Sequence, residues 1–89
     1  MKIRIDRPSE MGAVIKSARK RQRLRQDDVA GIVGVSENFL GKVENGGETV
    51  QWGKLFQVLQ GLGVEVWLDM PDTTIQTGGA DSSRERSGK

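Results

Sequence analysis

The stretch from Gln26 to Glu44 constrains the fold of this chain more than any other part of the sequence. Two helices joined by a tight turn need a small residue at their contact, a residue that tolerates positive φ in the turn, and apolar residues at fixed offsets. Ala30 is the small residue, and Gly34 follows four residues later in the turn. The apolar offsets hold Val29, Val33, Val35, Leu40 and Val43. Because every position of the pattern is filled, the stretch predicts a tight helical pair.

Local signals place the ends of this pair and of a helix before it. The first helix of the pair is expected from Gln26 to Val33, and Ser36 is a good N-cap for the second, which reaches about Glu44. Pro8-Ser9 predicts the start of the earlier helix, which should extend to about Arg23. Its apolar stripe at helical spacing holds Met11, Val14, Ile15 and Ala18.

A fourth helix is expected after the loop Asn45-Gly46-Gly47, with Thr49 as its N-cap and Gly61 and Gly63 at its end. One face of this helix carries Trp52, Leu55, Phe56, Leu59 and Leu62. Such a stripe is more often buried in a core than used as a ligand groove, so we expect it to be buried.

Alternating segments lie at both ends of this helical body. Lys2–Asp6 and Val64–Asp69 alternate polar and apolar residues, which predicts two short strands. Because a lone two-stranded ribbon is marginal in water, we expect these strands to pair across a homodimer. The predicted fold class is therefore mainly α, a compact helical bundle with short terminal β-strands.

The chain is expected to form one domain, residues 1–70, followed by a polar tail, residues 71–89. The tail contains one large apolar residue, Ile75, and cannot offset its own ordering entropy, so we expect it to be disordered. It is either an inert terminus or a segment that folds on a partner.

Composition excludes several classes of function. The chain has no His and no Cys, so the usual general base, thiol nucleophiles and Cys- or His-based metal sites are missing. We therefore expect no enzyme activity, no metal and no cofactor. The sequence has no apolar segment long enough for a membrane span and no signal peptide, which indicates a cytoplasmic protein without a membrane partner.

Charge is unevenly distributed along the chain. The total is only +2, but residues 1–62 carry +4 and residues 63–89 carry −2. Between Lys16 and Arg25 there are six basic residues and no acidic one. Such a run can be a solvated helix face, but beside the helical pair we favour contact with phosphates.

From Met11 to Val64 the sequence resembles the Xre/Cro family of helix-turn-helix proteins, which includes phage repressors. The resemblance rests on the basic first helix, Gln26 at the start of the second helix, Val35-Ser36 before the recognition helix and Glu44-Asn45-Gly46 after it. It implies a lambda-repressor-like fold. The C-terminal strand and polar tail are similar to the HipB subgroup, the antitoxins that partner the HipA kinase.

The resemblance also implies a role for each matching position. The residues expected to contact DNA bases are Ser36, Glu37, Asn38, Phe39 and Lys42. The residues expected to contact phosphates are Gln26, Arg25, Arg23, Asn45 and Lys16. Arg19 and Glu44 match positions that form a structural salt bridge in the family. The residues expected at the dimer contact are Val64, Val66, Trp67 and Leu68. Alternatively, Trp67 anchors a different protein partner.

Two departures from the family pattern stand in the helical pair. Arg25 replaces the usual Ser or Thr before Gln26, so a cap is lost and a phosphate contact is gained. Gly41 lies inside the recognition helix, as Gly31 and Gly53 do in two other helices, and each costs up to about 1 kcal/mol of helix stability relative to Ala.

These features predict a sequence-specific DNA-binding repressor of transcription. We expect the protein to bind a palindromic operator as a homodimer. We also expect it to be the antitoxin of a HipBA-like operon, which represses its own operon and binds a HipA-like kinase toxin. One alternative is a stand-alone Xre-type repressor. Another is a protein-interaction module that neutralises a toxin, with DNA binding incidental.

Overall fold

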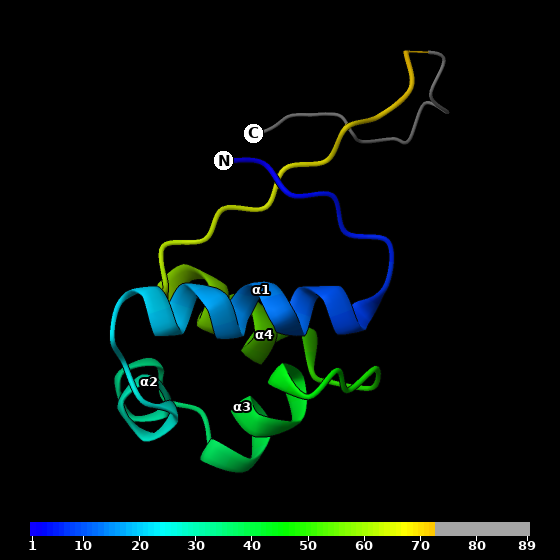
Figure 1. Ribbon diagram of the computed structural model, residues 1–89. Coiled ribbons are helices and arrows are strands. Elements are labelled where there is room, and N and C mark those ends of the chain that lie inside the picture. The colour runs from blue at the N-terminus through cyan, green and yellow to red at the C-terminus, as the bar shows by residue number, and fades with distance from the viewer. Residues whose placement is uncertain (73–89) are drawn as a thin grey trace, which may run out of the picture.

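The computed structural model describes residues 1–72 (Figure 1). In each of its first three helices, a side chain near the N-terminal end accepts a hydrogen bond from a nearby backbone N–H. The helices are α1 (Pro8–Arg21), α2 (Gln26–Val33), α3 (Glu37–Glu44) and α4 (Trp52–Gly61). At α1, Glu10 Oε1 accepts from the backbone N–H of Asp6 at 2.6 Å. At α2, Asp28 Oδ2 accepts from the N–H of Arg25 at 3.0 Å. Ser36 Oγ accepts from the N–H of Phe39 at 3.0 Å, which confirms Ser36 as the N-cap of α3.

All four helices end in the same way. After each one, a backbone N–H donates to the carbonyl five residues back, as Leu24 does to Arg19 at 3.1 Å. The residue just before that donor has positive φ, and in three helices it is a glycine: Gly34, Gly46 or Gly63. In α1 it is Arg23, with φ 59°. This turn is the reason that α1 ends at Arg21 and not at the predicted Arg23.

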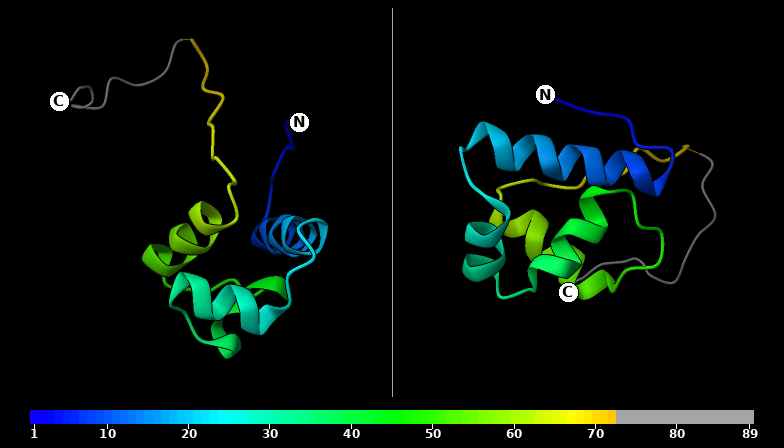
Figure 2. Two further views of the ribbon diagram at one scale, coloured as in Figure 1. Left: turned by 90° about the vertical axis from the view of Figure 1, so that its left-hand side faces the viewer. Right: turned by 60° about the horizontal axis from the view of Figure 1, so that its bottom comes forward.

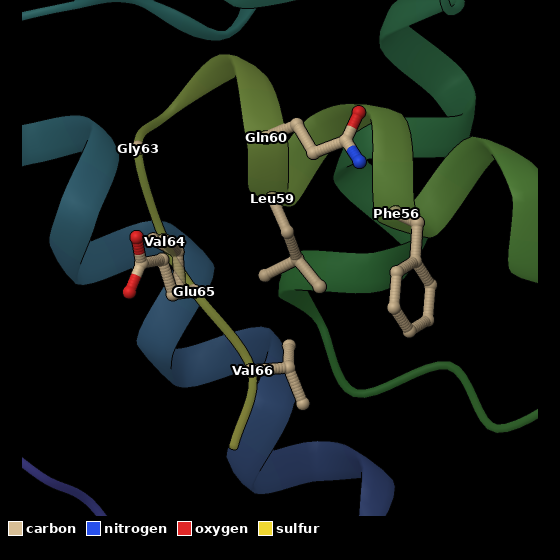
Figure 3. A pocket seen from close by; sticks show the side chains of 7 residues that line it. All are labelled: Phe56, Leu59, Gln60, Gly63, Val64, Glu65 and Val66. Carbon is tan, nitrogen blue, oxygen red and sulfur yellow. The ribbon is translucent and has the colours of Figure 1, made fainter. Parts of the chain in front are cut away.

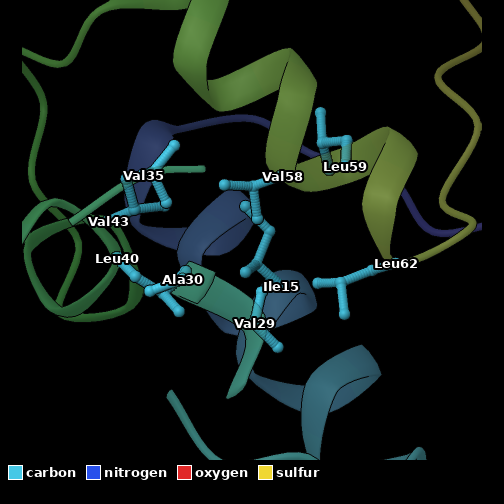
Figure 4. Close-up of a cluster of buried hydrophobic side chains, with 9 residues drawn as sticks. All are labelled: Ile15, Val29, Ala30, Val35, Leu40, Val43, Val58, Leu59 and Leu62. Carbon is cyan, nitrogen blue, oxygen red and sulfur yellow. The ribbon is translucent and has the colours of Figure 1, made fainter. Parts of the chain in front are cut away.

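The core forms where the helices cross. The largest fully buried side chains are Ile15, Leu40, Leu59, Val29 and Val58 (Figure 4). α1 packs on α3, and α2 packs on both α3 and α4. This arrangement confirms the mainly α bundle and the predicted helical pair, which the structure places at Gln26–Val33 and Glu37–Glu44.

The inward face of α1 differs from the predicted stripe. Gly12, Ile15 and Arg19 are its buried residues, whereas Met11 and Ala18 are only partly buried at the edge of the core. A Cβ at Gly12 would collide with the carbonyl oxygen of Val43, so α1 and α3 approach backbone to backbone there.

The predictions for α4 were wrong at its start and on part of its face. The helix begins at Trp52 with Gln51, not Thr49, as its N-cap. Trp52 is 73% exposed and Phe56 is 38% exposed, although Leu59 and Leu62 are buried as expected. Val58 is fully buried and lies at the centre of the face that α4 turns to the core. The apolar residues of α4 therefore extend beyond the part of the helix that the other helices cover, and Trp52 and Phe56 remain exposed.

The two predicted terminal strands are not confirmed in the single chain. Within residues 1–72, the segments 2–6 and 64–69 have no strand ladder. A strand requires a hydrogen-bonded neighbour, and neither segment has one within the described part of the chain. Both leave the body on the side opposite α2 and α3 (Figures 1 and 2). The predicted tail, residues 71–89, lies outside the described residues from residue 73 onward.

No helix among the described residues is long and apolar enough to cross a membrane. Residues 1–72 also contain no group of three or more His, Cys, Asp or Glu side chains that could hold a metal ion.

Candidate nucleic-acid interface

α3 has one face in the core and one face in solvent. Leu40, Val43 and Glu44 are buried, and because these positions lie within one turn they fix the rotation of the helix. The opposite face carries Asn38 and Lys42, both exposed. These two side chains make no hydrogen bond or ion pair within the part of the chain that the structure describes, so their donors and acceptors are available to a ligand.

The other predicted base-contacting residues lie around this face. Glu37 and Ser36 are exposed at the N-terminal end of α3. The Ser36 oxygen caps the helix, which leaves its hydroxyl hydrogen to donate elsewhere. Phe39 differs from these residues because it is half-buried and packs against the core. Lys54 of α4 places its Nζ 5.9 Å from the centroid of the Phe39 ring, within range of a cation–π contact.

A buried ion pair ties α3 to α1. Arg19 Nε donates to Glu44 Oε2 at 2.7 Å and Arg19 Nη2 donates to Glu44 Oε1 at 2.9 Å. The side chains are 9% and 2% exposed. Arg19 Nη1 also donates to the carbonyl of Leu24 at 2.9 Å. The structure thus confirms the salt bridge that the family resemblance implies.

Gln26 connects this pair to the surface. Its Nε2 donates to Glu44 Oε1 at 3.1 Å, which holds the half-buried side chain of Gln26 against α3. Burial alone would raise the pKa of Glu44, but the hydrogen bonds from Arg19 and Gln26 hold that pKa below its usual value, and nearby Lys16 lowers it further. The hydrogen bond to Glu44 raises the pKa of Arg19. Both residues are therefore charged at neutral pH.

Gly41 leaves open space beside this network. A Cβ added at Gly41 would lie 3.9 Å from Gln26 Oε1 and meet no other atom within 4 Å. Gln26, at the N-terminus of α2, therefore lies beside α3 at Gly41, the residue before Lys42.

The predicted phosphate-contacting residues occupy different elements. Lys16 lies on α1 and shares an exposed concave face with Lys20 and Arg21. Arg23 lies in the α1–α2 turn and is exposed. Asn45 is exposed at the C-cap of α3.

Arg25 has a local partner. It precedes α2, and its Nη2 pairs with Asp27 Oδ2 at 2.7 Å on the surface. Its side chain makes no cap hydrogen bond, in agreement with the expected loss of the family's Ser or Thr cap.

The residues predicted for the dimer contact lie apart from this surface. Val64 is partly buried against the core, whereas Trp67 and Leu68 are 80% and 82% exposed in the C-terminal segment. Val66 borders an open groove beside α4. The segment that holds them, residues 64–69, leaves the body on the side opposite α3 (Figure 1).

Sequence reasoning missed Lys54. It is exposed, and its charge lies near α3 only because α4 passes beside Phe39. The one available signal is that Lys54 is the sole basic residue between Lys42 and the end of α4.

Comparisons with known proteins agree with this geometry. A family model described as a helix-turn-helix domain matches residues 10–66. The uncharacterized HTH-type transcriptional regulator y4mF of Sinorhizobium fredii is 46% identical over 63 residues, which make up 71% of this chain and 83% of that protein.

Two solved structures have the same fold. A HipB–O4 20mer complex has a TM-score of 0.72 at 20% identity and covers 78% of this chain and 97% of its own. A HipA–HipB–O2–O3 complex has a TM-score of 0.69 at 20% identity, with coverage of 82% and 100%. At this level of identity, the similarity is one of fold.

Proposed function

This chain belongs to the helix-turn-helix domain family, and we propose that it is a sequence-specific DNA-binding repressor of transcription that acts as a cytoplasmic homodimer. The family is a DNA-binding one and not an enzyme family. The relative y4mF carries the name of a transcriptional regulator, which supports the same role.

The exposed face of α3 is the observation that carries the proposal. Asn can bond adenine through two hydrogen bonds and Lys can reach the acceptors of guanine, and Asn38 and Lys42 are both exposed and unpaired within residues 1–72. Ser36 and Glu37 flank them at the end of the helix that would enter the major groove. Phe39 would reach a thymine methyl only with the edge of its ring, because the ring packs on the core.

Phosphate contacts would hold this helix in place. Gln26 lies at the N-terminus of α2, where the helix dipole and free backbone N–H groups favour an anion. Arg23, Arg25, Asn45 and Lys16 surround the helical pair and would add further contacts. In a dimer on a palindromic operator, two recognition helices would lie about 34 Å apart, one helical turn of DNA.

The experiment is a fluorescence anisotropy titration on a duplex that the protein selects from a random pool. If six to eight phosphates are neutralised, log K should fall against log salt with a slope of about −5 to −7. A binding constant that does not respond to salt would exclude this function.

Lys42→Ala separates base reading from phosphate contact. We expect it to weaken binding about tenfold or more on the selected duplex and much less on random DNA, as a lost base contact should. Lys20→Ala, which removes an exposed lysine from α1, is the matched control and should weaken both duplexes equally. Equal losses for Lys42→Ala would make Lys42 a phosphate contact.

A second candidate role is that of an antitoxin. Trp67 and Leu68 are exposed, and the C-terminal segment that carries them leaves the body on the side away from α3 (Figure 1), so a protein partner there would not compete with DNA for α3. The fold similarity to HipB, seen in complex with HipA, favours a HipA-like kinase as that partner.

The neighbouring gene tests the antitoxin role. A kinase-like product of the adjacent reading frame that co-purifies with this chain would support it, and the same experiment without residues 71–89 would measure the contribution of the tail. An adjacent integrase or phage cassette would favour a stand-alone repressor. Partner binding without any DNA affinity would favour an interaction module.

A further inference from the structure

Two segments outside the helical body have complementary sequences. We call residues 2–6 the N-terminal arm and residues 64–70 the C-terminal arm. In the N-terminal arm, Ile3 and Ile5 alternate with Lys2, Arg4 and Asp6, which together carry a net charge of +1. In the C-terminal arm, apolar residues alternate with Glu65, Trp67 and Asp69. One arm is basic and the other is acidic on its polar face, and each has an apolar face.

The apolar face of the C-terminal arm is uncovered. Val64 packs against the core, but Val66, Leu68 and Met70 become exposed as the arm leaves the body. On the other face, Trp67 Nε1 donates to Glu65 Oε1 at 3.2 Å, so these two side chains lie on one side as the alternation requires. The arm has the pattern of a strand but lacks a neighbour.

An open groove continues this apolar face. It has a volume of about 440 Å³ and lies between α4 and the start of the C-terminal arm. Phe56, Leu59 and Val66 point toward one another around it (Figure 3). Its lining is mainly apolar, so it suits branched aliphatic side chains.

We propose that the N-terminal arm of a second copy of this chain pairs with the C-terminal arm and places its Ile3 and Ile5 in this groove. In an antiparallel pairing with Arg4 opposite Glu65, Ile3 lies opposite Val66 and Ile5 lies opposite Val64. Basic and acidic side chains then meet on one face, and apolar side chains meet on the other.

Charge favours this occupant over a second C-terminal arm. Two C-terminal arms would bring two acidic segments together, and in the register centred on Trp67 Glu65 would lie opposite Asp69, where like charges destabilise a sheet. The chain's own N-terminal arm makes no ladder with its C-terminal arm in residues 1–72, and its Arg4 Nε bonds Asp6 Oδ1 at 3.1 Å. The inference rests on the proposed function in one respect, because a palindromic operator requires two copies.

Engineered cysteines test the pairing in the full chain, which has no cysteine of its own. Chains with Arg4→Cys and chains with Glu65→Cys, one of them carrying a mass tag, are mixed, oxidised and separated without reductant. We expect the mixed covalent dimer to exceed both same-variant dimers at least fivefold. Gln57→Cys, at an exposed position of α4 outside the groove, is the control partner for Arg4→Cys and should give no such excess.

Other crosslinking patterns would overturn the proposal. A predominance of Glu65→Cys dimers would mean that two C-terminal arms pair. A chain with both cysteines that forms only an internal crosslink and stays monomeric would mean that each chain uses its own arm.

Charge reversal supplies a second measurement. Arg4→Glu or Glu65→Arg should each raise the dimer Kd in analytical ultracentrifugation about tenfold, because a symmetric dimer contains two such pairs. The double variant Arg4→Glu/Glu65→Arg should restore the wild-type dimer Kd. An unchanged dimer Kd in either single variant would contradict the pairing. Neither experiment contains DNA, so failure of this inference is distinguishable from failure of DNA binding.

Discussion

Among residues 1–72, Arg23 is the one residue other than glycine with a left-handed backbone conformation. Its φ of 59° closes α1, and the corresponding residue after every other helix is a glycine. A left-handed backbone costs a residue with a Cβ about 1–2 kcal/mol. Its presence in the turn therefore fits a role for the side chain, and phosphate contact is the role that we predict.

Arg23→Gly should thus move stability and DNA affinity in opposite directions. We expect the free energy of unfolding to rise by up to about 1 kcal/mol in urea denaturation, because relief of strain exceeds the added freedom of the unfolded chain. DNA affinity should fall several-fold, with a salt slope about one unit shallower. An unchanged slope would remove Arg23 from the phosphate contacts.

Glu44 makes stability depend on pH. Its pKa is lowered in the folded chain from the usual 4.5, so it contributes stability above that pH and loses the contribution as pH falls through the folded value. Glu44→Gln should cost about 3–5 kcal/mol near pH 7, because it leaves the buried Arg19 without its counterion.

The loss should shrink in acid. Denaturation curves at pH 7 and pH 3 should show a smaller difference between wild type and Glu44→Gln at the lower pH. The exposed Glu48→Gln is the control and should differ little from wild type at either pH. A difference that is equal at both values would mean that the carboxylate charge contributes nothing to the pair.

Backbone contact between α1 and α3 depends on Gly12. Gly12→Ala should lower the free energy of unfolding by more than about 2 kcal/mol, because its Cβ would overlap the Val43 carbonyl and the helices would have to separate. Gly31→Ala is the matched control, because no atom lies within 4 Å of the added Cβ. It should raise the free energy of unfolding by about 0.5–1 kcal/mol. If Gly12→Ala and Gly31→Ala had equal effects in thermal denaturation, the close approach of α1 to α3 at Gly12 would be contradicted.

The elements differ in how far the sequence predicts them. The ends of α2 and α3 follow from Asp28, Ser36 and Gly34, which act within a few residues, and so they were predictable. Helical periodicity identifies the apolar residues of α4 but does not show which of them other helices cover. The prediction that Trp52 is buried is therefore wrong. Gly12 gave no signal, because a glycine counts as neither polar nor apolar in such a pattern.

The candidate site shows the same division. The roles that we predict for Gln26 and Lys42 follow from positions within a motif. The contact of Lys54 with Phe39 joins α4 to α3 across the fold and has no sequence spacing of its own. The terminal segments form no strand ladder within residues 1–72, because the partner strand that we propose belongs to another copy.

At the scale of the whole molecule, α3, which we propose to read DNA, and the C-terminal arm lie on opposite sides of the body (Figure 2). A body with so small a core gains stability when a second copy covers its exposed apolar residues. The melting temperature should therefore rise by about 3 °C or more for each tenfold increase in protein concentration. Far-UV circular dichroism measures this, and a constant melting temperature would mean that the monomer alone carries the stability.

Both tryptophans are outside the core, and this has a consequence for spectroscopy. Trp52 stacks on Phe56 with ring centroids 5.9 Å apart, and Trp67 extends from the C-terminal arm. Their emission in an isolated chain would already resemble that of tryptophan in water. Intrinsic fluorescence would therefore change little when the helices unfold. It would instead shift to the blue when another chain covers the indoles, so tryptophan emission would report assembly of the chain and not its unfolding.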